Sequence, residues 1–185
     1  GHIWMGGAEK SAAGYLFVAN LPTEEVYTLP KRDGVNGTVV SSKPLHYNGN
    51  LIQGFSFTFC AGRVVDYTAK QGAEHLKELL ATDEGASFLG EAALVPHSSP
   101  ISKSGLLFYN TLFDENASCH LALGKAYPTC MENGAQMTAD ELRRHGVNHS
   151  IVHEDFMIGT SDLSVVGRTR SGETIPIMEN GNFSF

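Results

Sequence analysis

The sequence is poor in cysteine, in basic residues and in long apolar runs, and each shortage argues against a class of protein. Three cysteines, Cys60, Cys119 and Cys130, lie far apart without a CxxC pair, which speaks against both a disulfide framework and a structural zinc knot. Thirteen Lys and Arg against 20 Asp and Glu give a net charge of −7, unsuited to a nucleic-acid-binding face. No apolar run could cross a bilayer, and no secretory signal pattern is present. We therefore expect a cytoplasmic protein that binds neither nucleic acid nor membrane.

The length suits one domain with a sizeable core, or at most two small ones, because the chain has 185 residues. Its hydrophobic content of 42% is ordinary for a globular protein. The chain starts at a glycine rather than a methionine, and we expect it to be part of a longer protein.

Patterns typical of strands outnumber those typical of helices. Runs of β-branched and aromatic residues bounded by turn residues predict strands at residues 14–21, 24–30, 37–47, 51–69, 88–96 and 150–159, with a terminal hairpin over 163–181. The apolar run 14–21 should be a buried strand. The segment 37–69 should hold two or three strands, with a turn at 48–50.

Helical patterns are fewer. Apolar residues at helical spacing predict a helix over 71–82. A second helix is expected over 138–146, where Thr138 and Glu141 can form a capping box and Gly146 can end the helix. Because strands and helices do not alternate regularly, the sequence predicts an α+β fold with a mixed, largely antiparallel twisted sheet and a few helices.

The run "HED" at 153–155 is the first candidate for chemistry. Residues two apart in a strand project from the same face, so His153 and Asp155 should point together while Glu154 points away. A histidine beside a carboxylate is half of a metal site. The polar face of an ordinary surface strand would produce the same letters.

The run "DENASCHLALG" at 114–124 is the second candidate, and it fits a short helix that Asp114 caps and a glycine ends. Such a helix would place Asn116 and His120 on one face, with Glu115 at its edge. The alternative is a capped helix whose one histidine is partly buried and hydrogen-bonded.

Cys119 lies in the same run and has two interpretations. Free cysteine is among the most buried residue types, so packing explains it without any chemistry. The other interpretation makes Cys119 or Cys130 the nucleophile of a thiol hydrolase, with a histidine as its base.

Acidic residues inside apolar segments need a partner, because an isolated buried carboxylate is costly. Glu91 lies in "FLGEAALV", and Glu24 and Glu25 interrupt "ANLPTEEVYTLP". Only one of the latter pair can face a given site in extended chain. A shared divalent cation would explain several of these carboxylates at once.

The candidate ligands together combine carboxylates with imidazoles, a mixture that suits zinc, cobalt or manganese. More than four candidates favour two metals that share bridging carboxylates. The absence of HExxH excludes the common single-zinc protease pattern. The candidates are Glu25 (or Glu24), Glu91, Glu115, His120, His153 and Asp155.

Four blocks of the sequence resemble a known family. "ANLPTEEVYTLP", "LGEAALVP", "TLFDENASCHLALGKAY" and "HEDFMIGT" are similar in order and spacing to the thermophilic-type metallo-aminopeptidases, the family of aminopeptidase T, aminopeptidase S and PepS. The blocks cover most of the chain. The resemblance implies a two-metal exopeptidase that removes the N-terminal residue from peptides.

Residue by residue, the resemblance implies roles for the matching positions. Glu91 would bridge the metals or act as a base, Glu91 or Glu115 would take a proton from water, and Tyr127 would be the catalytic tyrosine that stabilises the oxyanion. The implied metal ligands are Glu25, Glu91, Glu115, His120, His153 and Asp155.

The chain departs from the family in length. Members carry an α/β domain before this region and work as homodimers, so residues 1–185 resemble the C-terminal catalytic domain of a two-domain protein. An inactive metal-binding or dimerisation fragment is therefore an alternative to an active enzyme.

Overall fold

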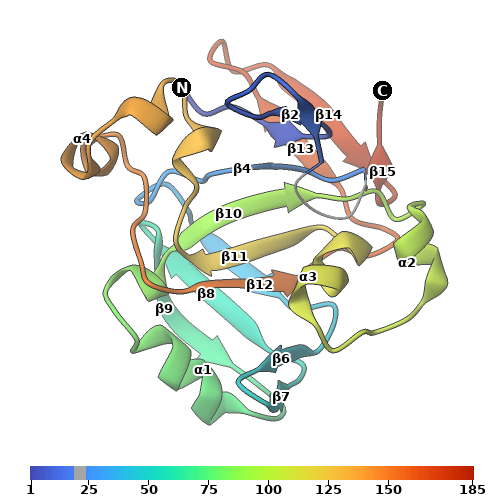
Figure 1. The fold of residues 1–185 in the computed structure, drawn as a ribbon. Coiled ribbons are helices and arrows are strands. Elements are labelled where there is room, and N and C mark those ends of the chain that lie inside the picture. The colour runs from blue at the N-terminus through green and yellow to red at the C-terminus, as the bar shows by residue number, and fades with distance from the viewer. Residues whose placement is uncertain (19–23) are drawn as a thin grey trace.

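A five-stranded sheet forms the centre of the computed structural model, which describes residues 1–18 and 24–185 (Figure 1). The strand order is β1–β4–β10–β11–β12, and each neighbouring pair is antiparallel. The strands are β1 (Met5–Gly6), β4 (Val26–Thr28), β10 (Leu89–Leu94), β11 (His120–Gly124) and β12 (His153–Met157). One face of this sheet is packed against the core, and the other carries the polar residues considered below.

A second group of elements lies behind and below the central sheet in Figure 1, and its apolar side chains form the main core together with those of that sheet. It consists of β5 (Gly37–Val40), β6 (Leu45–Tyr47), β7 (Asn50–Ile52), β8 (Ser56–Cys60), β9 (Arg63–Thr68) and the helix α1 (Ala73–Leu80). Alternation along β8 turns Phe57 and Phe59 inward. Phe57 packs edge-on against Phe156 of β12, with ring centroids 5.1 Å apart, so the aromatic side chains join the two layers.

The segment 37–69 therefore contains five strands rather than the expected two or three. The strands are short and their connections are tight, so the sequence shows them as a few continuous β-rich runs. The turn at 48–50 is confirmed: Asn48 and Gly49 both have positive φ, at 48° and 80°, as a tight hairpin turn requires.

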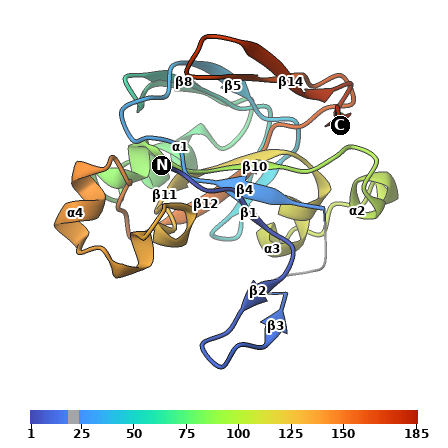
Figure 2. The same cartoon turned by 90° about the horizontal axis from the view of Figure 1, so that it is seen from above.

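The remaining described strands form two small sheets. β13 (Val165–Arg168), β14 (Thr174–Glu179) and β15 (Asn182–Phe183) form a three-stranded sheet, which confirms the terminal hairpin. β2 (Glu9–Lys10) and β3 (Leu16–Phe17) form a hairpin that projects from the body (Figure 2).

The prediction of a buried strand over 14–21 is wrong where the structure describes it. Tyr15 and Leu16 are 75% and 68% exposed, because β3 pairs with β2 instead of entering the central sheet. Residues 19–21 lie outside the described part.

The predicted helices α1 and α4 (Ala139–Arg144) are both present, and the α+β class is confirmed. Thr138 and Glu141 form the capping box, while Gly146, with φ of 81°, follows the last helical turn one residue after the cap at His145. No helix in the described ranges is long and apolar enough to cross a membrane. The other helices are α2 (Pro100–Ser104), α3 (Thr111–Asp114) and the 3₁₀ turns η1 (Gly85–Ser87), η2 (Glu115–Ala117), η3 (Pro128–Cys130) and η4 (Gly134–Gln136).

Candidate metal centre

Strand register brings the acidic and histidine side chains to one face of the central sheet. Ala122 of β11 pairs with Glu91 of β10 on one side and with Asp155 of β12 on the other. Directly opposed residues of neighbouring strands project to the same face. Because Ala122 has only a methyl group, the two longer carboxylates can converge above it.

A bulge at Gly90 is what turns Glu91 to this face. Leu89 pairs with Leu123, and Glu91 with Ala122, so Gly90 is the extra residue. In a regular strand Glu91 would share the face of Leu89, which belongs to the main core. The bulge re-aims the side chain, a common use of bulges beside functional sites. An isolated glycine within a strand pattern is the sequence signal for it.

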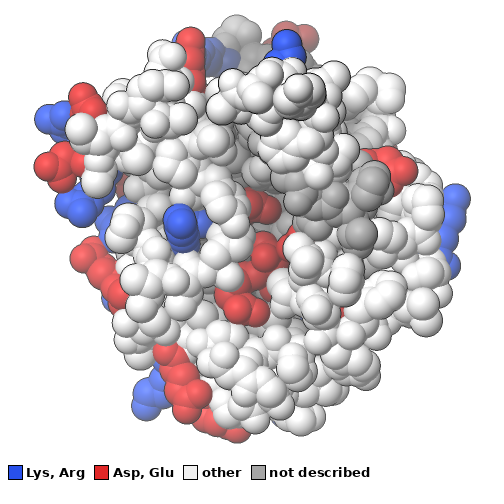
Figure 3. All heavy atoms as spheres, in the orientation of Figure 1, with Lys and Arg blue, Asp and Glu red and all other residues white. Residues whose placement is uncertain are grey.

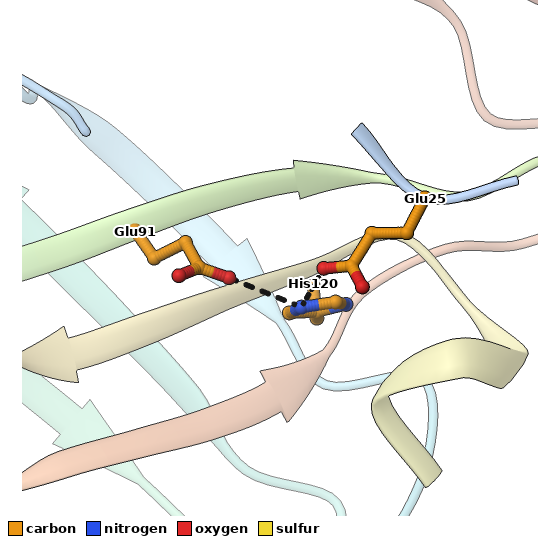
Figure 4. A group of neighbouring side chains, drawn as sticks. All are labelled: Glu25, Glu91 and His120. Carbon is orange, nitrogen blue, oxygen red and sulfur yellow. Dashed lines mark ion pairs between the residues drawn. The ribbon is translucent and has the colours of Figure 1, made fainter. Parts of the chain in front are cut away.

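The first group of converging ligand atoms is formed by Glu25, Glu91 and His120 (Figure 4). His120 Nε2 lies 3.2 Å from Glu25 Oε1 and 3.4 Å from Glu91 Oε1. All three side chains are largely buried; Glu25 retains 13% exposure and His120 1%. The neighbouring Glu24 is exposed, so the structure places Glu25, and not Glu24, at the site.

The second group is formed by Glu91, His153 and Asp155. His153 Nε2 lies 3.4 Å from Asp155 Oδ1 and 3.7 Å from Glu91 Oε2. The same-face prediction for His153 and Asp155 is therefore confirmed. Glu91 belongs to both groups and turns one carboxylate oxygen to each histidine.

The two histidines are held in the same way. His120 Nδ1 lies 3.0 Å from the carbonyl oxygen of Ser118, and His153 Nδ1 lies 2.7 Å from that of Lys125. A carbonyl only accepts, so each Nδ1 carries a proton and donates it. Each Nε2 is then the nitrogen that faces the carboxylates, and its lone pair is available to a metal in the neutral ring.

Two buried atoms without hydrogen-bond partners suit a cation site. Among the described residues, His120 Nε2 and Asp155 Oδ1 are buried without a hydrogen-bond partner, although buried polar atoms are normally satisfied. Carboxylate oxygens and imidazole nitrogens that point at one another are the donor set of a divalent cation. The residues therefore fit a metal centre.

Without a cation, protons must balance the clustered negative charge. Burial alone would lower the pKa of His120, but Glu25 and Glu91 outweigh it, and the pKa lies well above its usual value. Burial likewise opposes charging of His153, yet Asp155 raises its pKa to about 9. A cation bound to Nε2 would replace those protons.

Tyr127 borders the second group. Its ring centroid lies 4.8 Å from that of His153, and the side chain is 39% exposed. Burial, together with the charges of Glu91, Asp155 and Glu115, raises the pKa of Tyr127 to about 12. The phenol therefore stays protonated near neutral pH and can donate a hydrogen bond.

Glu115 is placed differently from the other predicted ligands. It lies in η2, and of the described residues neither converging group includes it. Its charge does reach Tyr127, so it is close to the centre without belonging to either group.

The predicted helix over 114–124 is wrong beyond its first turns. α3 begins after Asn110, whose side chain accepts from the Leu112 amide, so Asp114 is not the N-cap. The chain becomes extended at Ser118, with φ of −165°, and His120 starts β11. Asn116 and His120 therefore do not share a helical face. Pairing with β10 and β12 on both sides favours the strand over local helix propensity.

Cys119 is a packed residue. It is 2% exposed, and its Sγ lies 3.3 Å from the carbonyl oxygen of Val95 and 3.7 Å from Met178 Sδ. Burial raises the pKa of its thiol, which disfavours the reactive thiolate. Cys130 is buried as well. These environments argue against the thiol hydrolase.

The site lies in a hollow. Figure 3 shows acidic atoms gathered in a depression on the face where β10, β11 and β12 lie in Figure 1. A depression lined by carboxylates attracts cations, including a positively charged amino group.

Comparison with known proteins agrees with this centre. Residues 1–183 match the family described as "Thermophilic metalloprotease (M29)". The chain is 62% identical over 185 residues to "Aminopeptidase 2" of Geobacillus stearothermophilus and 55% identical over 184 residues to "Aminopeptidase AmpS" of Bacillus subtilis. Each match covers 100% of this chain and 45% of the relative.

A solved structure, "Wild-type AmpT from Thermus thermophilus", is similar with a TM-score of 0.94 and 45% identity. The match covers 100% of this chain and 45% of that one. The chain therefore spans less than half the length of the relatives it matches.

Proposed function

The chain belongs to the thermophilic metalloprotease family M29, and we propose that residues 1–185 form the catalytic region of a metal-dependent aminopeptidase. The region would hold two divalent cations, with zinc, cobalt and manganese as candidates, and the protein would remove the N-terminal residue from peptides. The names of the relatives, all aminopeptidases, support this reaction.

The observation that carries the proposal is the double use of Glu91. Its Oε1 faces His120 and its Oε2 faces His153, so one carboxylate joins two carboxylate–imidazole groups. A bridging carboxylate between adjacent ligand sets is the arrangement of two-metal hydrolases. Glu25 and His120 would hold one cation with Glu91, and His153 and Asp155 the other. Glu115 is a proposed ligand on the family resemblance alone.

The chemistry divides between the cations and the side chains. When bound, the cations polarise the scissile carbonyl and make water more acidic. Glu115, or Glu91 if it does not bridge the cations, accepts the proton of the attacking water and passes it to the leaving nitrogen. Tyr127 donates its phenolic proton in a hydrogen bond to the carbonyl oxygen as that oxygen gains negative charge.

Recognition of a chain end follows from the same charges. A free N-terminus is a cation, and a carboxylate that faces the hollow can accept its N–H groups. An acetylated N-terminus lacks that charge and should be refused.

We further propose that the active protein is a homodimer in which an additional α/β domain walls off the hollow.

The first test uses the whole protein, its metal content and two matched peptides. We expect two bound cations per chain, hydrolysis of a peptide with a free N-terminus and no hydrolysis of its N-acetylated form. Removal of the metal with a chelator should abolish turnover, and adding back zinc, cobalt or manganese should restore it. Full activity after complete metal removal would contradict the proposal.

Two controls separate the alternatives. His120→Ala should lose metal and activity, whereas His75→Ala, in α1 and outside both ligand groups, should lose neither. Alkylation of thiols should leave turnover unchanged; inactivation by the alkylating agent with metal retained would favour the thiol hydrolase. Bound metal without any turnover by the whole protein would favour the inactive metal-binding domain.

A further inference from the structure

The carbonyl group of Lys125 determines how His153 faces the centre. It accepts the Nδ1 proton of His153 at 2.7 Å. That hydrogen bond directs Nε2 toward Glu91 and Asp155. A shift of this carbonyl would let the imidazole ring turn or change its tautomer.

Asn148 fixes the segment on both sides of that carbonyl. Its side-chain Nδ2 donates to the Gly124 carbonyl at 2.6 Å. Its main-chain carbonyl accepts from the main-chain amide of Ala126 at 3.1 Å. Asn148 therefore binds the residue before and the residue after Lys125. It is 1% exposed and lies outside both ligand groups.

The orientation of the Asn148 amide is itself determined by its neighbours. Its Nδ2 donates to the carbonyl oxygens of Gly85 and Gly124, at 2.9 and 2.6 Å, while its Oδ1 accepts from Arg32 Nε at 3.1 Å. Both donors and one acceptor position are thus used. A side chain without two N–H groups cannot make the hydrogen bonds to both carbonyl oxygens.

Gly90 limits the position of the same carbonyl. A Cβ at this position would overlap the carbonyl oxygens of Lys125 and of Gly124, the residue that Asn148 binds. Gly90 has no positive φ, so alanine would be tolerated by the local backbone, and the overlap is the main cost. The residue that makes the bulge for Glu91 also leaves room for the acceptor of His153.

We propose that Asn148 and Gly90 are positioning residues that hold the Lys125 carbonyl where it accepts the Nδ1 proton of His153. Neither touches the ligand atoms, and both act through His153. The inference rests on the proposed metal centre and adds the residues that orient half of it.

The experiment compares Asn148→Asp and Gly90→Ala with the unmodified whole protein. Aspartate keeps the shape and the acceptor for Arg32 but removes both amide donors. Competition titration against a chromophoric chelator gives the zinc affinity, which should fall about tenfold in each variant, the lower end expected for groups that orient a ligand. Asn36→Asp and Gly167→Ala, at distant turn and strand positions, should leave the affinity unchanged.

A second measurement reports each histidine separately. In the cobalt-loaded protein, NMR should show one solvent-exchangeable Nδ1 proton for His120 and one for His153, assigned by replacing each histidine. Both variants should broaden the His153 signal by faster exchange and leave the His120 signal, which depends on Ser118, unchanged.

Unaltered affinity and an unaltered His153 signal in both variants would overturn the inference. Equal loss of both histidine signals would also overturn it, since Asn148 and Gly90 would then support the whole sheet. An unmodified protein that binds no zinc refutes the proposed metal centre, and this inference with it.

Discussion

Replacement of Ala122 by valine should weaken metal binding without unfolding the protein. Ala122 is fully buried and lies between Glu91 and Asp155 in the central sheet. Valine is favoured in strands, so the backbone should accept it. Its two additional methyl groups, however, enter the space over which the two carboxylates converge.

The size of the effect follows from the cost of overpacking. Two added methyl groups in a filled space cost about 1–3 kcal/mol, and the strain is greatest when both carboxylates must close on cations. At 1.4 kcal/mol per factor of ten, the dissociation constant should rise roughly 5- to 140-fold. The cation nearer His153 and Asp155 should be affected more, because both carboxylates of that group, Glu91 and Asp155, lie directly opposite Ala122.

The assay is competitive zinc titration of the whole protein, with thermal unfolding of the metal-free form as a check of the fold. Ala92→Val is the matched control: Ala92 follows Glu91 and pairs with Leu121 and Thr28, so its methyl group points to the other face. Equal zinc affinities for Ala122→Val and the unmodified protein would refute the placement of Ala122 among the ligands. Equal losses in both variants would refute it as well.

Three further results are expected. Tyr127→Phe should lower kcat by about 10²–10³ with metal content unchanged, because the phenol acts only on the developing oxyanion; an unchanged kcat would make the residue structural. Glu115→Gln should reduce metal content if Glu115 is a ligand, as the resemblance implies, and retained metal with a lower kcat would assign it the proton instead. Asp83→Asn should destabilise the fold by about 1–2 kcal/mol at neutral pH, since the carboxylate accepts from Ser150 Oγ and the Ile151 amide at 2.7–3.0 Å. Burial raises the pKa of Asp83, but these hydrogen bonds lower it by more, so the folded pKa lies below its usual value. The stability that the Asp83 carboxylate contributes is therefore present above the unfolded pKa of about 3.9 and is lost as pH falls through the lower folded pKa. The difference in Tm between the unmodified protein and Asp83→Asn should shrink below about pH 4.

The part of the site on β12 could be predicted from the sequence because that strand is regular. Spacing by two residues was enough to bring His153 and Asp155 within 3.4 Å. The resemblance to a family supplied the remaining residue types in their order. Neither source shows that Glu91 is shared between the groups, because that depends on register between strands that lie far apart in the chain.

The predictions that failed share a physical cause. Residues 114–124 suit a helix locally, but β10 and β12 provide strand partners on both sides of His120, and tertiary pairing outweighs propensity. The apolar letters of Tyr15 and Leu16 indicate burial, but they do not specify the surface that would cover them. Composition identifies an element more readily than it identifies the neighbours of that element.

The bulge at Gly90 shows why the list of ligands is easier to predict than their geometry. Strict alternation from Leu89, whose side chain is in the core, would send Glu91 into the core as well, where an unpaired carboxylate costs several kcal/mol. One extra residue reverses the face, and the side chain then meets two histidines that are oriented by backbone carbonyls. The second of those carbonyls, that of Lys125, occupies the space that a side chain at Gly90 would fill. Gly90 is thus the extra residue that directs the Glu91 carboxylate, and its missing Cβ leaves room for the carbonyl that orients His153. Gly90→Ala keeps the extra residue but fills that room, so it should impair the group of Glu91, His153 and Asp155 even though glycine itself offers no ligand atom.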